Sequence, residues 1–121
     1  MKSKDSTESI RAYYFNCGLG DMPPIPKIKN IHSKVYRAAK RKGALDMGLF
    51  HGCETTHCRA GWVIHLAGKT GYALEKFCGP ALAAILIYRE SGYEIDREMF
   101  YCNEFYALDD MKRLAEQEGK S

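Results

Sequence analysis

The sequence predicts an all-α fold, a compact orthogonal bundle of five to six helices that follows an N-terminal arm. Apolar residues recur at spacings of three and four along most of the chain, which is the period of one helix face. Glycine, proline and capping residues stand between these segments, and no alternating apolar and polar run is bounded by hairpin turns. We assign residues 1–27 to the arm and residues 28–121 to the helical body.

Length and composition indicate a single domain. A chain of 121 residues, of which 45% are hydrophobic, can bury one core. The longest near-apolar stretch, residues 80–88, is much shorter than a membrane helix, and the first residues lack the apolar segment of a secretory signal. We therefore expect a cytoplasmic protein with no membrane contact, whose five cysteines are reduced thiols.

The arm is predicted to contain one short amphipathic helix over residues 6–16. Asp5 followed by Glu8 resembles a capping box at its start. Three prolines and two glycines within residues 18–30 then predict an extended linker to the body.

The first helix of the body is predicted over residues 31–42, with Asn30 as its N-cap and Gly43 at its end. Its inward stripe consists of Ile31, Val35, Ala38 and Ala39. Its opposite side carries four cations, Lys34, Arg37, Lys40 and Arg41. A face of this kind can bind phosphates, or it can be the solvated side of a helix that docks on the core.

The next predicted helix is closed by Gly68, and Thr55 or Thr56 is its expected N-cap. Its residues are apolar on nearly all sides, which predicts burial. Gly61 within it costs about 1 kcal/mol relative to alanine, so it indicates the close approach of another backbone.

Three helical segments are predicted in the rest of the body. Residues 72–78 form one or two turns, and Pro80 opens a core helix over the most apolar segment of the chain. After a connector, Asn103 caps the last helix. That helix turns five residues inward, Ala107, Leu108, Met111, Leu114 and Ala115.

Residues 44–75 gather two cysteines, three histidines and the only tryptophan around the start of one helix. Thiolate and imidazole are the ligands that zinc prefers, and the zinc candidates here are His51, Cys53, His57 and Cys58. Their spacing is unfavourable, because adjacent side chains at a helix start diverge by about 100° and no C-x-x-C or H-x-x-x-H pair is present. We therefore favour core packing over zinc.

Redox or nucleophilic chemistry at Cys58 is a second alternative to packing. The helix dipole and free amides of a first helical turn lower the pKa of a thiol, and Cys53 would be the resolving partner. The spacing is again not C-x-x-C, and no acid is placed to orient His57 or His65. Cysteine also packs as a small buried hydrophobe, so packing remains the preferred interpretation.

The net charge of +3 is the sum of a basic first third of the chain and an acidic remainder. Residues 1–43 contain ten Lys and Arg and three acids, a balance of +7, whereas residues 44–121 contain eight cations and twelve acids, a balance of −4. A basic first third fits an acidic partner, a nucleic acid or the acidic part of the same chain.

Three sequence blocks in the body, ALDM, CETTHCRAGW and HLAG, follow one another in this order. With them the chain resembles a family of small proteins that bacteriophages, prophages and other mobile elements encode. The similarity covers residues 28–117, leaves residues 1–24 outside, and has one departure in Phe50, where the family often has tryptophan. The resemblance implies a mobile-element protein in the cytosol of a bacterial host, and it brings no catalytic residue or cofactor to any position.

This context implies a non-enzymatic protein that binds and inhibits a host complex, most simply an anti-defence factor of the anti-CRISPR type. A CRISPR effector or another nucleoprotein is the expected partner. The predicted partner-binding residues are Tyr13, Tyr14 and Phe15 as aromatic anchors and Lys34, Arg37 and Arg41 as steering charges.

Two other functions remain open at this stage. The first is a nucleic-acid-associated accessory protein that uses the basic helix 31–42, with zinc at the Cys/His cluster. The second is an enzyme that acts through Cys58. The opposite charges of the two parts of the chain could also drive self-association.

Overall fold

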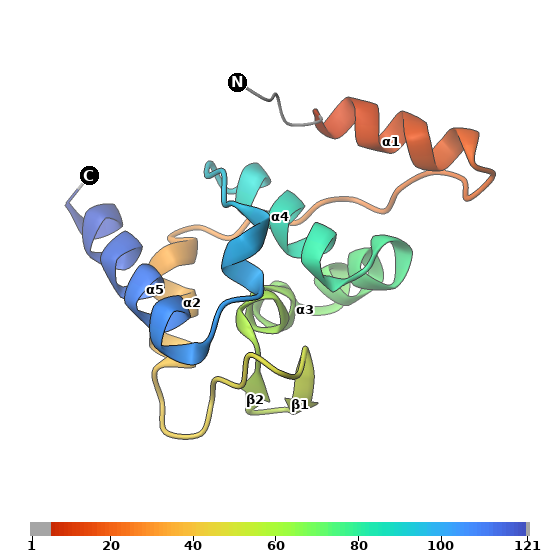
Figure 1. Cartoon of the computed structure of the whole chain (residues 1–121). Coiled ribbons are helices and arrows are strands. Elements are labelled where there is room, and N and C mark those ends of the chain that lie inside the picture. The colour runs from red at the N-terminus through yellow and green to blue at the C-terminus, as the bar shows by residue number, and fades with distance from the viewer. Residues whose placement is uncertain (1–5, 121) are drawn as a thin grey trace.

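The structure, a computed structural model, describes residues 6–120. Within this range it contains five α-helices, one 3-10 helix and one two-stranded antiparallel hairpin (Figure 1). In chain order these are α1 (Thr7–Asn16), α2 (Ile31–Ala39), β1 (His51–Cys53), β2 (Thr56–His57), α3 (Arg59–Cys78), α4 (Pro80–Glu90), η1 (Arg97–Phe100) and α5 (Glu104–Gly119). The all-α class is confirmed, and the short hairpin is the one element type that the sequence pattern did not predict.

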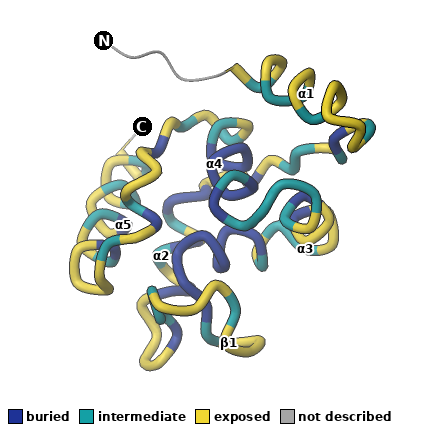
Figure 2. The backbone as a smooth tube through the Cα atoms, turned by 45° about the vertical axis from the view of Figure 1, so that its right-hand side comes forward, coloured by how far each residue is buried: buried dark blue, intermediate teal, exposed yellow. Residues whose placement is uncertain are grey.

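The core lies among the last four α-helices. α3 packs against α4 and α2 packs against α5, while contacts between α2 and α3 join the two pairs. α4 is the most buried element, with seven buried residues out of eleven, as its apolar sequence predicts. α1 has no buried residue and lies at the edge of the molecule in both views (Figures 1 and 2).

The side chain of a buried arginine connects α3, α4 and α5 through hydrogen bonds. Arg59, at the start of α3, donates from Nε to the Tyr88 hydroxyl on α4 at 3.1 Å and from Nη1 to the Asp110 carboxylate on α5 at 2.8 Å. The Arg59 side chain is fully buried. Because a buried charge is tolerated only with partners, this set of contacts fixes how α5 sits on α3 and α4.

α3 begins later than predicted. Its N-cap is Cys58, whose Sγ accepts a hydrogen bond from the Gly61 amide at 3.4 Å, and neither Thr55 nor Thr56 has this role. Thr56 belongs to β2, and its hydroxyl donates to the Gly43 carbonyl at 2.8 Å. Thr56, which the sequence pattern offered as an N-cap of the helix, is therefore part of the hairpin.

The label α3 covers two helices that meet at Gly68. Gly68 has φ 75° and ψ −150°, a non-helical backbone, so the first helix ends there as the glycine predicts. The second helix contains the segment predicted over residues 72–78 and starts a few residues before it. It ends at Cys78 before Gly79, as predicted.

α2 is shorter than predicted and is capped differently. It ends at Ala39, so Arg41 lies beyond it, while all four residues of its predicted apolar stripe are buried. Asn30 has a left-handed backbone (φ 57°) and makes no side-chain cap bond. The Glu118 carboxylate of α5 accepts instead from the amides of His32 at 3.2 Å and Ser33 at 2.8 Å.

The remaining helix boundaries agree with the sequence pattern. Pro80 opens α4, and the Asn103 side chain caps α5 by accepting from the Tyr106 amide at 3.0 Å. α1 lies where it was predicted, but its N-cap is Ser6, and Asp5 of the predicted capping box is outside the described residues.

Part of the predicted arm belongs to the core. Met22, within the predicted arm, and Ile28, the first residue of the predicted body, are buried in the same cluster as residues of α3 and α4. The Ile28 amide donates to the Ser91 hydroxyl at 2.9 Å. The linker is therefore anchored to the body, and the segment before Met22 contacts it only through partly buried side chains such as Ile10 and Tyr14. Within residues 6–120, no helix combines the length and the apolar character that crossing a membrane requires.

Candidate functional site

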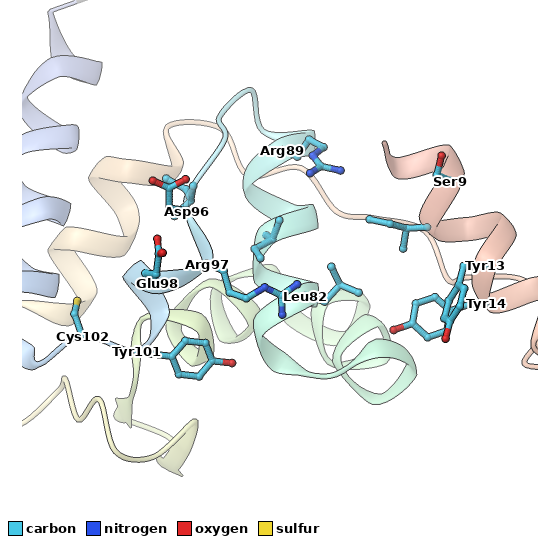
Figure 3. Close-up of a pocket in the computed structure, with 13 residues that line it drawn as sticks. Ser9, Tyr13, Tyr14, Leu82, Arg89, Asp96, Arg97, Glu98, Tyr101 and Cys102 are labelled. Atoms are coloured by element: carbon cyan, nitrogen blue, oxygen red, sulfur yellow. The ribbon is translucent and has the colours of Figure 1, made fainter. Parts of the chain in front are cut away.

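A groove of about 1280 Å³ lies between α1 and the body (Figure 3). Tyr13 and Tyr14 of α1 line one side, and Tyr101, which follows η1, lines the other. The apolar side chains of Leu82 and Ile85 on α4 lie between the two sides. The groove thus exists only because the arm is placed beside the body.

The groove presents two accessible aromatic rings and four charged side chains, the last being two arginines and the carboxylates of Asp96 and Glu98. Tyr13 is 65% exposed and Tyr101 is 62% exposed. Arg97 is exposed, extends into the groove beside Leu82 in Figure 3, and forms no ion pair with any residue of 6–120. Arg89, on the same groove, is paired with Glu94 at 3.0 Å. The site can therefore accept apolar or aromatic groups, and Arg97 is the lining cation without an ion pair to residues 6–120 that an acidic group could contact.

A small set of contacts holds α1 in place. The Tyr14 ring packs on the Phe77 ring of α3, with 5.2 Å between centroids, and Arg89 of α4 donates to the Thr7 hydroxyl at 3.4 Å. Burial raises the pKa of the Tyr14 phenol above its ordinary value, because the phenolate is poorly solvated against the body. Ile10 adds a partly buried apolar contact.

The structure divides the six predicted partner-binding residues among three environments. Tyr13 and Phe15 are exposed on α1, as aromatic anchors should be. Tyr14 instead attaches the arm to the body. The cations of the prediction, Lys34, Arg37 and Arg41, lie on or after α2, and α4 separates that helix from α1 in Figure 1.

Most of the groove lining was missed by the sequence analysis, which identified only Tyr13 and Tyr14 of it. Arg97 and Tyr101 belong to the segment between the last two predicted helices, which the pattern predicts as a connector. Their position opposite α1 depends on tertiary structure, so no signal in this segment indicated it.

The histidines of the Cys/His cluster lie within hydrogen-bonding or ring-contact distance of one another and of neighbouring oxygen atoms. The Nδ1 atoms of His51 and His57 lie 2.8 Å apart across the hairpin. His51 Nε2 lies 2.9 Å from the Glu75 carboxylate, and His57 Nε2 lies 3.1 Å from the Glu54 carbonyl. Every ring nitrogen of these two histidines therefore has a protein partner. His65 extends the cluster by stacking on His57, with 4.6 Å between ring centroids.

The four zinc candidates do not converge on one point. His51 and His57 use their nitrogens for the contacts above, Cys58 is buried as the cap of α3, and Cys53 is exposed on β1. In the described part of the chain, no group of three or more His, Cys, Asp and Glu residues is arranged to hold a metal ion.

The two cysteines of the cluster differ in the pKa of their thiols, and in the opposite sense to the redox alternative considered from sequence. Burial raises the pKa of the Cys58 thiol and outweighs the hydrogen bonds from the Gly61 and Ala60 amides. The Thr55 hydroxyl and amide, together with Thr56, lower the pKa of the exposed Cys53 thiol to about 7. The expectation of a lowered pKa at Cys58 was wrong because the side chain is in the core, where the thiolate is poorly solvated.

No protein-family model, no curated protein and no solved structure matches this chain. The groove and the cluster are therefore interpreted from their own chemistry.

Proposed function

We propose that this chain is a non-enzymatic binding protein that holds a segment of a partner protein in the groove between α1 and the body. The observation that carries the proposal is the pair of exposed tyrosines, Tyr13 and Tyr101, on opposite sides of an apolar floor. Tyrosine and arginine are enriched where proteins bind one another and are the usual residues with large binding contributions. Arg97 adds the charged group that such an interface uses for orientation.

The size of the groove favours a peptide segment over a small molecule. Pockets for small ligands typically measure about 300–1,000 Å³, and this groove measures about 1280 Å³. It has room for several side chains of a partner, with an acidic residue beside Arg97.

The groove lining favours binding over catalysis. No histidine lines it, and the Cys102 thiol there donates to the Met99 carbonyl at 3.7 Å. Among residues 6–120, the lining carboxylates Asp96 and Glu98 form no hydrogen bond with Ser9 or Cys102, the nucleophile–base contact that covalent catalysis needs.

The resemblance to mobile-element proteins suggests the partner. We propose a complex of the bacterial host, in the host cytosol, and an anti-defence role of the anti-CRISPR type in which occupation of the groove sequesters a component of that complex. Inhibition would then follow from competition for a protein surface and would need no cofactor.

The first test is affinity capture of the tagged chain from bacterial lysate after nuclease treatment. A stoichiometric partner is expected, and its Kd should rise at least about tenfold when Tyr13 and Tyr101 are both changed to alanine. Phe105→Ala with Tyr106→Ala is the matched control, because this exposed aromatic pair lies outside the groove. A loss of binding in the control and not in the groove variant would contradict the proposal.

A further inference from the structure

We propose that the exposed face of α2, together with the adjoining edge of α5, binds the phosphate backbone of a nucleic acid. This basic face is formed by residues that do not line the groove between α1 and the body. The inference therefore adds a second binding surface and does not depend on the first.

The charge of the basic face comes from an unusual stretch of sequence. Residues 22–45 contain no aspartate or glutamate and seven cations, Lys27, Lys29, Lys34, Arg37, Lys40, Arg41 and Lys42. All seven side chains are exposed. None forms an ion pair with another residue of 6–120, since the ion pairs there involve other cations.

α5 extends this charge across a shallow groove. The two helices pack together and lie side by side in Figure 1, and a hollow of about 240 Å³ separates their exposed edges. Arg37 of α2 and Lys40, which directly follows that helix, line it on one side, and Lys112 lines it from α5. Glu116 also lines the hollow, so three cations and one carboxylate leave it positively charged.

Hydroxyl groups and an aromatic ring complete the lining. Ser33 and Tyr36 contribute side chains that can donate hydrogen bonds to phosphate oxygens. Lys40 Nζ lies 5.3 Å from the centre of the Tyr36 ring, which holds the ammonium group at the hollow. The N-terminal amides of α2 are already occupied by Glu118, so side chains are the groups that would hold a phosphate here.

This composition fits nucleic acid better than a protein surface. Lysine is depleted from protein interfaces, which depend on buried aromatic and apolar anchors. Among residues 6–120, the large exposed hydrophobic residues all lie outside residues 22–45 and outside the part of α5 that begins at Ala107. Phosphate backbones, in contrast, are bound mainly by Lys and Arg and need no apolar anchor.

The test is fluorescence anisotropy of the full chain with labelled probes of about 30 nucleotides, namely single-stranded RNA, single-stranded DNA and duplex DNA, between about 50 and 200 mM salt. If four phosphates are contacted, duplex affinity should fall roughly 100-fold across this range. Arg37→Glu with Lys40→Glu should weaken binding at least about tenfold. Lys69→Glu with Lys76→Glu makes the same change of charge on exposed residues of α3 and should leave the affinity within about twofold.

Replacing Arg37 and Lys40 with glutamine is a milder change that removes their charge without reversing it. It should reduce the slope of log affinity against log salt concentration by about one per lost phosphate contact. Circular dichroism checks that the helix content is unchanged. Absence of binding to all three probes at low salt would overturn the inference, as would an equal loss in the α2 and α3 variants. The groove variant with Tyr13 and Tyr101 changed to alanine should bind the probes like wild type, so failure of one proposal is distinguishable from failure of the other.

Discussion

Gly61 shows how closely the chain before α3 approaches that helix. A Cβ atom at this position would overlap the carbonyl oxygen of Phe50 and lie 2.9 Å from the Cβ of His57. A glycine in an apolar helix pattern predicted the close approach of another backbone, and the structure confirms it. The approaching segment is the one that leads into the hairpin.

We therefore expect Gly61→Ala to lower the free energy of unfolding by about 1–3 kcal/mol, because the Phe50 backbone must move to make room. Gly119→Ala is the matched control, since nothing lies within 4 Å of a Cβ added there. Urea unfolding followed by circular dichroism measures both. An unchanged stability in Gly61→Ala would show that this segment does not pack against α3 as described.

His32 is a buried titratable side chain that the sequence pattern did not reveal. Its ring lies 4.0 Å from the Tyr93 ring and 5.6 Å from the Tyr88 ring, measured between centroids, and neither ring nitrogen has a hydrogen-bond partner among the described residues. Burial lowers the pKa of His32 below its ordinary value, against the opposing charge of Glu118.

A histidine whose pKa is lower in the folded protein than in the unfolded chain destabilises the fold on acidification. The unfolded chain takes up the proton first, so stability should fall as the pH drops below about 6.5, the unfolded value. Burial lowers the pKa of His57 as well, which acts in the same direction. The pKa of Glu118 is also lowered, because hydrogen bonds from Ser33 and His32 outweigh its burial, but this carboxylate contributes only at more acidic pH.

His32→Phe keeps a flat ring between the two tyrosines and removes the titrating group. The loss of unfolding free energy between about pH 7.5 and 5.5 should be smaller in this variant than in wild type. Urea unfolding at the two pH values measures the difference. An equal loss in both proteins would mean that His32 does not titrate differently in the folded and unfolded chains.

At the scale of elements, the starts of α2 and α5 look alike in sequence and differ in structure. Asn103 accepts a hydrogen bond from the Tyr106 amide at 3.0 Å, whereas Asn30 makes no cap bond and has a positive φ. Asn103→Ala should therefore cost about 1 kcal/mol of stability. Asn30→Gly should cost nothing or stabilise slightly, since glycine adopts this backbone conformation freely.

Thermal and urea unfolding of these two variants make the comparison. Destabilisation by Asn30→Gly of the same size as that by Asn103→Ala would show that Asn30 does cap α2, and that Glu118 does not replace it.

Elements with long periodic patterns were predictable, and the short ones were not. α4 and α5 agree with their apolar spacing and with Pro80 and Asn103 at their starts. The hairpin has strands of three and two residues, too short for an alternating pattern to be recognised. Because Thr56 pairs in this hairpin, α3 begins later than predicted and Cys58 is its N-cap.

At the scale of the whole molecule, the arm and the body are joined by few contacts. α1 has no buried residue, and Tyr14 on Phe77 is its main ring contact with the body. We expect Tyr14→Ala to increase the amide hydrogen exchange of α1 while leaving that of α4 unchanged. The free energy of unfolding of the body should change by less than about 0.5 kcal/mol.

Tyr13→Ala is the control for this measurement, because Tyr13 is exposed and its ring contact is with Tyr14 of the same helix. Faster exchange in α4 of Tyr14→Ala would mean that the arm stabilises the core directly.

The candidate site was only partly predictable, for reasons of tertiary structure. Tyr13 and the cations of the α2 segment could be identified from sequence, because the aromatic run of the arm and the basic side of the predicted helix 31–42 can be recognised in it. The positions of Arg97 and Tyr101 opposite α1 follow from how the connector crosses the body. No spacing rule indicates that the polar side chain of Arg59 would be fully buried.

The central claim is that a partner occupies the groove between α1 and the body. Photocrosslinking tests it most directly, with a benzophenone amino acid placed at Tyr101 inside the groove or at Tyr106 outside it. We predict that the captured partner crosslinks from position 101 and not from position 106. Crosslinking from position 106 alone would contradict the account and place the partner on the start of α5.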